Sequence, residues 1–231
     1  MVRLYLFAEG RVEQTFANSV LGPHLALHGV YMKKPVLIAN AHKKQRIHRG
    51  GGGNFAAMQK DIHRFLKQER GRDVFFTSMI DLYALHKGFP GTDEAQKFRE
   101  DPYRRVQMLE EAWASETNDC RFIPHIQLHE YETYLFANIS ILSNYYPDEQ
   151  HAIAELHESS ERFETPELID DGPDTAPSKR IVEHIPRYAS DKATVGVQAA
   201  EQIGLPAIRS RCPHFSQWLE RLECLGAQSE A

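Results

Sequence analysis

Short apolar runs alternate with amphipathic segments through the first 140 residues of the chain. Residues 2–8 form a short apolar run rich in strand-forming side chains, which ends at Glu9-Gly10 and predicts a buried strand. Similar runs predict strands at residues 35–39, 74–80 and 122–128.

Helical patterns lie between these strands. In residues 54–70, apolar side chains recur on one helical face, and Gly71 follows as a terminator. Residues 103–116 also predict a helix, and residues 12–27 predict one with a break at Pro23. Strands that alternate with helices predict an α/β fold with a mostly parallel sheet flanked by helices.

Strand signals stop after Asn138. Helices are expected at residues 147–163, 178–187, 192–203 and 214–225, so the last third of the chain is mainly helical. We therefore expect an α/β core over residues 1–140 and a helical extension over 141–231 that packs on it.

Acidic residues follow the predicted strands. Glu9 follows the first strand, Asp81 the third, and Glu130 and Glu132 the fourth. Ligands of open α/β sheets bind outside the carboxyl ends of the strands, where these side chains would converge. Converging carboxylates repel one another unless a cation lies between them, and Mg²⁺ or Mn²⁺ suits oxygen ligands. Glu13, one helical turn after Glu9, would add a ligand for a second metal.

Each acidic position also has an ordinary structural explanation. Glu13 could be a favourable charge at a helix N-terminus, and Glu132 an exposed helix residue. His129 could be a general base or a metal ligand, or could complete a hydrogen-bond network. The pattern alone leaves these alternatives open.

The charge balance restricts how the chain could contact nucleic acid. With a net charge of −5, phosphate contacts must come from bridging metal ions or a local basic patch. Residues 42–53 are the most basic stretch and end in four glycines, and a solvated loop is the alternative reading. The candidate nucleic-acid contacts are Lys43, Lys44, Arg46, Arg49, Lys179 and Arg180.

Several classes of protein are disfavoured. No apolar run is long enough to predict a membrane span, and Glu9 comes too early for a secretory signal. Three widely spaced cysteines argue against a disulfide framework and for a cytoplasmic setting. Neither a phosphate-binding P-loop nor a GxSxG nucleophile elbow is present.

The string LFAEGRVE at residues 6–13 resembles the first motif of Toprim domains, including the nuclease domains of OLD-type ATPases. A Toprim-like family of unknown function, often encoded beside an ABC- or SMC-type ATPase, is the more similar. Its further matching strings are TSMIDLYALHKGFPG at 77–91, RFIPHIQLHEYETYLF at 121–136, PELIDDGPDTAPSKRI at 166–181 and CPHFSQWL at 212–219.

The resemblance implies a Toprim fold, a four-stranded parallel sheet with divalent metal at the strand ends. It also implies a late lysine, Lys192 or Lys179, that stabilises charge on the transferring phosphate. The usual Asp-x-Asp motif is reduced here, because Tyr83 replaces its second member. Glu130 or Glu132 would then supply the missing oxygen, and Tyr83 would pack or bond a phosphate.

The leading hypothesis is a Mg²⁺- or Mn²⁺-dependent nuclease that cuts DNA or RNA. Its catalytic residues would be Glu9, Glu13, Asp81, Glu130 and Lys192, and its metal ligands Glu9, Glu13, Asp81, Glu130 and Glu132. The resemblance implies an ATPase partner and a role in bacterial anti-phage defence. A non-catalytic module that binds an ATPase or nucleic acid is the alternative, and a small-molecule phosphohydrolase or primase-like transferase is a third.

Overall fold

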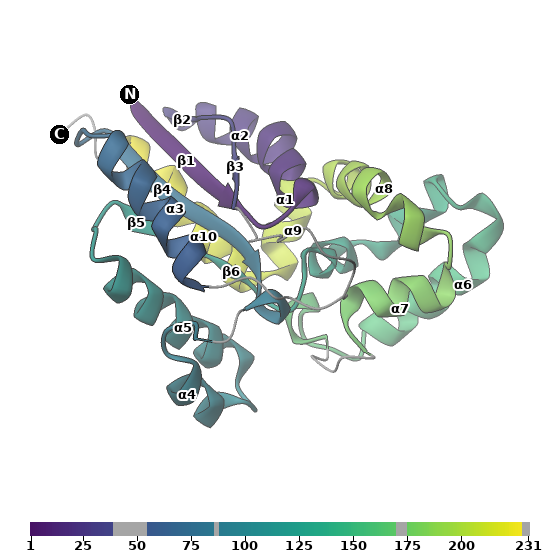
Figure 1. Cartoon of the computed structure of the whole chain (residues 1–231). Coiled ribbons are helices and arrows are strands. Elements are labelled where there is room, and N and C mark those ends of the chain that lie inside the picture. Colours follow the sequence, from purple (N-terminus) through teal and green to yellow (C-terminus); the bar gives the residue numbers. More distant parts are fainter. Residues whose placement is uncertain (39–54, 86–87, 170–174, 228–231) are drawn as a thin grey trace, which may run out of the picture.

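A parallel β-sheet forms the centre of the molecule. The computed structural model describes residues 1–38, 55–85, 88–169 and 175–227 (Figure 1). The strands are β1 (Val2–Ala8), β2 (Val30–Met32), β3 (Val36–Leu37), β4 (Val74–Asp81), β5 (Phe122–Ile123) and β6 (Ile126–Gln127).

The strand order is β2-β1-β4-β5, with β3 also paired to β1 and β6 also paired to β4. All five pairings among the described strands are parallel. The predicted α/β fold with a parallel sheet is therefore confirmed. Five of the described strands lie in the four predicted ranges, and β2 is additional.

The predicted fourth strand is split between β5 and β6. Pro124 lacks an N–H for the ladder, and the Ser78 hydroxyl instead accepts a hydrogen bond from the His125 N–H at 2.8 Å. The register with β4 is the same on both sides of the break, where Thr77 pairs with Ile123 and Ile80 with Ile126.

Ten α-helices surround the sheet in the described part of the chain. Their bounds are α1 (Arg11–Phe16), α2 (Gly22–Ala26), α3 (Phe55–Gln68), α4 (Thr92–Ala95), α5 (Pro102–Thr117), α6 (Gln150–Ser160), α7 (Pro177–His184), α8 (Tyr188–Ile203), α9 (Leu205–Arg211) and α10 (Pro213–Ala227). A π-helical turn, Ala17–Leu21, joins α1 to α2 where the sequence predicted a kinked helix. Two helices, α4 and α9, were not predicted.

The two faces of the sheet bury different helices. Alternate β1 residues such as Leu4 and Leu6 belong to a core that includes residues of α1, α8, α9 and α10. Phe7 and the β4 residue Phe76 belong to a second core with residues of α3 and α5. The period-two alternation of a strand thus covers both faces, and the helical C-terminal part packs on one of them.

The strand order reverses between β1 and β4. After β1 the chain builds one edge of the sheet with β2 and β3, and then returns to the other side of β1 to form β4. Adjacent strands with connections to opposite sides create a crevice at their carboxyl ends. Figure 1 shows helices α6, α7 and α8 on the side where these strands end. Among the described helices, none has the length and apolar character needed to cross a membrane.

Helix α10 lies against the loop before β2 through Gly226. A Cβ atom at Gly226 would overlap the carbonyl oxygen of His28, so the two backbones would have to separate. We expect Gly226→Ala to lower the free energy of unfolding by about 1–3 kcal/mol. Chemical denaturation measures this, with exposed Cys224→Ala on the same helix as the control. Equal stability of the two variants would contradict the close packing.

Candidate functional site

Two carboxylates meet where β1 and β4 end. Glu9 directly follows β1, and Asp81 is the last residue of β4. The Asp81 N–H donates a hydrogen bond to Oε2 of Glu9 at 2.8 Å. The structure therefore brings these two predicted site residues together at the point where the strand order reverses.

Glu13 joins this pair from the first turn of α1. Its Oε2 accepts a hydrogen bond from the Gly10 N–H at 2.9 Å and so closes the start of the helix. Burial, together with the charge of Glu9, raises the pKa of Glu13 to about 7. The hydrogen bond from Gly10 alone would lower the pKa of Glu13. Burial and the charge of Glu9 outweigh this bond, so the charged form of Glu13 is unfavourable in this site.

Glu132 and Lys192 form a partly buried ion pair beside these carboxylates. Glu132 lies in the 3₁₀ segment Tyr131–Ala137 and is fully buried, so the alternative of an exposed helix residue is wrong. The Lys192 Nζ lies 3.0 Å from its Oε2, and the Tyr188 hydroxyl donates to its Oε1 at 3.2 Å. Tyr188 and Lys192 are one turn apart on α8, so both reach the same carboxylate.

The charges of these groups act on one another. Burial first, and then the charges of Glu9, Glu13 and Glu132, raise the pKa of Asp81 well above its usual range. Burial also raises the pKa of Glu9 and of Glu132. Burial alone would lower the pKa of Lys192, but the neighbouring carboxylates outweigh it and raise that pKa. We call Glu9, Glu13, Asp81, Glu132 and Lys192 the acidic cluster.

Glu130 lies next to the acidic cluster and holds the N-terminus of α7 in place. Its Oε2 accepts a hydrogen bond from the Ser178 N–H at 2.9 Å, in the first turn of α7. Its charge contributes to the raised pKa of both Glu9 and Glu132. Glu130 therefore makes ionisation of Glu9 and Glu132 less favourable, and it also binds the first turn of α7.

Sequence reasoning missed Gln127 on β6. Its Nε2 donates a hydrogen bond to Oδ1 of Asp81 at 2.6 Å, while its buried Oε1 has no hydrogen-bond partner among the described residues. An amide oxygen is a hard ligand of the same kind as a carboxylate oxygen. The one available signal was a polar residue inside an apolar run that predicted a strand.

The donor set of the acidic cluster fits a hard divalent cation. Every acidic member offers oxygen, and the buried negative charges are the kind that a cation relieves. In the described residues, groups of three ligand atoms that all lie within 4.8 Å of one another occur elsewhere, at two histidine–glutamate clusters. The acidic cluster is not one of these close groups, so an ion held there would take part of its coordination from water.

Comparison with known proteins gives one match. The model of a family described as "Domain of unknown function (DUF4276)" matches residues 8–223. The chain belongs to the DUF4276 family. The match covers every member of the acidic cluster as well as Gln127. Searches of curated proteins and of solved structures found no match.

His129 and Tyr83 of this DUF4276 chain contact each other. His129 has a left-handed backbone with φ 67°, and its Nε2 lies 2.9 Å from the carbonyl oxygen of Glu167. The Tyr83 hydroxyl lies 3.3 Å from Nδ1 of His129, and Tyr83 is 37% exposed. His129 thus has hydrogen-bond partners at both ring nitrogens, as in the network alternative, and Tyr83 is less packed than a core residue.

The predicted basic contacts are placed only in part. Lys43, Lys44, Arg46 and Arg49 lie outside the described residues. Lys179 is exposed on α7. Arg180 donates to the Thr175 carbonyl at 2.8 Å and lies over the Phe163 ring, so part of its side chain stabilises the fold.

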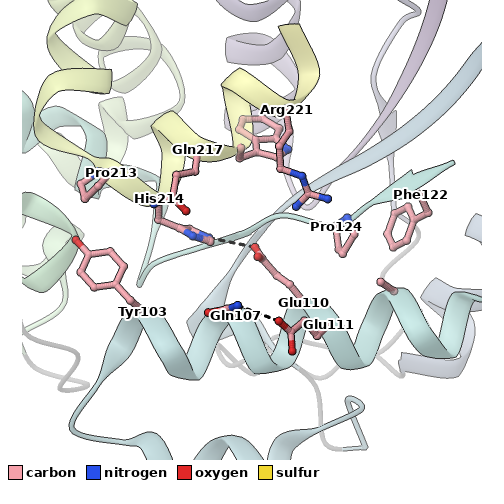
Figure 2. A pocket seen from close by; sticks show the side chains of 12 residues that line it. Tyr103, Gln107, Glu110, Glu111, Phe122, Pro124, Pro213, His214, Gln217 and Arg221 are labelled. Atoms are coloured by element: carbon pink, nitrogen blue, oxygen red, sulfur yellow. Dashed lines mark hydrogen bonds and ion pairs between the residues drawn. The ribbon is translucent and has the colours of Figure 1, made fainter. Parts of the chain in front are cut away.

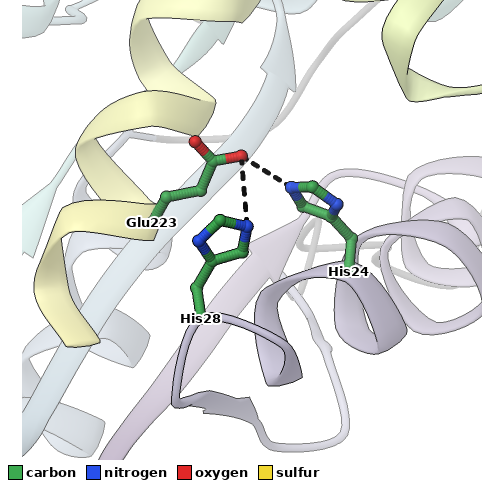
Figure 3. Close-up of side chains that lie close together, drawn as sticks. All are labelled: His24, His28 and Glu223. Atoms are coloured by element: carbon green, nitrogen blue, oxygen red, sulfur yellow. Dashed lines mark hydrogen bonds and ion pairs between the residues drawn. The ribbon is translucent and has the colours of Figure 1, made fainter. Parts of the chain in front are cut away.

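A histidine–glutamate cluster joins α2 and the turn that follows it to α10. Figure 3 shows His24 of α2 and His28, from the turn after α2, facing Glu223 of α10. Oε1 of Glu223 lies 2.6 Å from Nε2 of His24 and 3.9 Å from Nε2 of His28. Arg209 Nη1 lies 2.6 Å from the same oxygen, so this carboxylate already has a permanent cationic partner.

The raised pKa of Glu13 predicts a pH-dependent stability. Between an unfolded value near 4.5 and about 7, the folded state holds the proton more tightly, so stability is lost as pH rises through this range. Glu13→Gln keeps an oxygen acceptor for Gly10 and removes the charge. We expect it to stabilise the metal-free protein by about 1–3 kcal/mol at pH 8 and little at pH 4.5.

Denaturation of both proteins at the two pH values measures the effect. The exposed Glu158→Gln on α6 is the control and should change stability equally at both pH values. A Glu13→Gln variant that is less stable at pH 8 than the wild type would contradict the raised pKa.

Proposed function

We propose that this protein is a divalent-metal-dependent phosphodiesterase that cuts nucleic acid. The observation that carries the proposal is the convergence of four carboxylates and one lysine at the strand-order reversal. Perturbed carboxylates in such a crevice favour a functional site over a purely structural one. The resemblance of residues 6–13 to the first Toprim motif supports the same chemistry.

In this proposal, the position of each residue determines its role. Glu9 and Asp81 would hold Mg²⁺ or Mn²⁺, with Gln127 orienting Asp81 through its 2.6 Å hydrogen bond. Glu13 and Glu132 would complete the negative field around the ion. A bound divalent cation would polarise the phosphate and lower the pKa of a coordinated water.

Lys192 would act on the phosphate itself. Its side chain is 39% exposed although Glu132 is fully buried, so the ammonium lies at the boundary between the cluster and solvent. An ammonium in that position offsets negative charge that develops on a transferring phosphate. The basic residues near positions 43–49 and Lys179 would hold the backbone without reading its sequence.

A non-catalytic module is the second candidate. Tyr83 stands where the second acid of an Asp-x-Asp motif would be, and it contacts His129. A scaffold that had lost a metal ligand in this way would bind an ATPase or nucleic acid without cutting it. Calorimetric titration with Mg²⁺ and Mn²⁺ separates the two, because only the nuclease requires specific metal binding at the acidic cluster.

Incubation of the purified chain with plasmid DNA and with total RNA tests the proposal directly. Cleavage should require Mg²⁺ or Mn²⁺ and stop when EDTA removes the metal. If neither substrate is cut with either ion and no metal binding is measured, the nuclease proposal is rejected and the non-catalytic module is favoured. A nucleotide-controlled ATPase partner, a role in phage defence and a cytoplasmic setting are further parts of the proposal.

A further inference from the structure

A second cluster of metal-ligand side chains lies beside a cavity. Glu110 comes from α5, His125 from the break between β5 and β6, and His214 from the first turn of α10. One ligand atom of each lies within 4.8 Å of the others. In Figure 2, Glu110 and His214 point toward each other in the lining of a cavity of about 560 Å³.

The spacing of these atoms resembles that of a tetrahedral site. Nε2 of His214 lies 3.1 Å from Oε1 of Glu110, and Nδ1 of His125 lies 3.7 Å from the same oxygen. Zinc bonds of about 2.0–2.1 Å at tetrahedral angles separate neighbouring ligand atoms by roughly 3.3 Å. The two separations from Oε1 of Glu110 therefore lie close to the spacing of ligand atoms in a tetrahedral zinc site.

His125 supplies independent evidence for a ligand. Its ring is 1% exposed, and Nδ1 has no hydrogen-bond partner among the described residues. The 3.7 Å separation from Glu110 is too long for a hydrogen bond. A buried ring nitrogen without a partner is costly, and a metal ion is one way to satisfy it.

Other contacts fix the orientation of the ligands. Nε2 of His125 lies 3.2 Å from the Tyr134 hydroxyl, and the ring stacks on Trp218 with centroids 4.2 Å apart. Buried Glu167 accepts hydrogen bonds from the N–H groups of His214 and Phe215 at 2.9 and 3.0 Å. Such outer contacts hold metal-binding histidines in place.

We infer that Glu110, His125 and His214 bind a Zn²⁺ ion. Two imidazoles and one carboxylate are ligands that zinc prefers, and three protein ligands leave a fourth position. That position would be filled by water from the adjoining cavity, where Gln217 and Arg221 are further lining residues. On binding, the ion would replace the proton through which Nε2 of His214 bonds the Ile126 carbonyl at 3.2 Å.

This zinc site is independent of the proposed nuclease. It shares no residue with the acidic cluster and uses nitrogen as well as oxygen ligands. The His24–His28–Glu223 cluster is the weaker candidate, because Arg209 already neutralises Glu223 at 2.6 Å. It therefore provides a matched control.

The test is metal analysis of the full chain after chelation, incubation with Zn²⁺ and dialysis. We expect about one bound zinc per chain in the wild type. Glu110→Gln keeps an acceptor for the Ile126 N–H, which lies 2.8 Å from Glu110 Oε1, and His214→Gln changes a partly exposed ring. Each should weaken zinc binding more than about 100-fold, beyond the loss from an outer-shell change.

Cobalt gives a second readout. Co²⁺ in the wild type should show the visible absorption of four-coordinate cobalt, and both variants should lose it. Circular dichroism and thermal melting of the metal-free variants check that they are folded. Zinc-free wild type after incubation, or unchanged zinc binding in the folded variants, would overturn the site. So would a loss of zinc in His24→Gln together with its retention in Glu110→Gln.

Discussion

Asp81→Asn and Glu9→Gln should each abolish metal-dependent cleavage while the protein stays folded. Both substitutions keep the size of the side chain and remove a charge that the metal needs. We expect cleavage to fall by roughly 10²–10³-fold or more, as for the loss of a group that stabilises a transition state. Rates on the substrate found for the wild type measure this, with Glu158→Gln as the control outside the cluster.

Stability separates this prediction from simple damage to the fold. Burial and neighbouring carboxylates raise the pKa of Asp81, so its charged form is unfavourable in the metal-free state. Asp81→Asn should therefore melt no earlier than the wild type without metal, and gain less stability from Mg²⁺ or Mn²⁺. Wild-type cleavage by both variants would reject the assignment of these residues.

The strands were predictable because apolar runs of adequate length determine them. β1 was expected at residues 2–8 and is found at Val2–Ala8. β2 was missed, since it has only three residues and its central Tyr31 is exposed. Its partner β1 supplies the hydrogen bonds that make it a strand, and no local pattern records that.

The site was predictable where topology alone determines position. Glu9 and Asp81 had to meet once their strands were parallel neighbours, because carboxyl ends share one edge. The link between Glu132 and Lys192 spans sixty residues, and only the packing of α8 on the 3₁₀ segment brings them together. Gln127 was overlooked because a single polar residue inside an apolar run is a weak signal, and only the pairing of β6 with β4 brings its side chain to Asp81.

Lys192→Met should lower the rate of metal-dependent cleavage by roughly 10²-fold, as expected when a charge-stabilising group is lost. It should also destabilise the protein near pH 8, because buried Glu132 loses its cationic partner. We expect a loss of about 1–2 kcal/mol, below the range for fully buried pairs, since water reaches the half-exposed lysine. The raised pKa of Glu132 means that this loss shrinks as pH falls and the carboxylate is protonated.

A double variant tests whether Lys192 stabilises charge on the phosphate or only neutralises Glu132. In Lys192→Met with Glu132→Gln, no uncompensated charge is left, so the thermal stability at pH 8 should recover toward the wild type. Activity should stay low, because the ammonium that would face the substrate is still missing. If activity returned together with stability, Lys192 would be only a structural partner of Glu132. The metal alone would then have to stabilise the negative charge of the transition state. Lys192→Arg, which keeps the charge, should retain stability in either case, and its cleavage rate then measures how closely the cation must be placed.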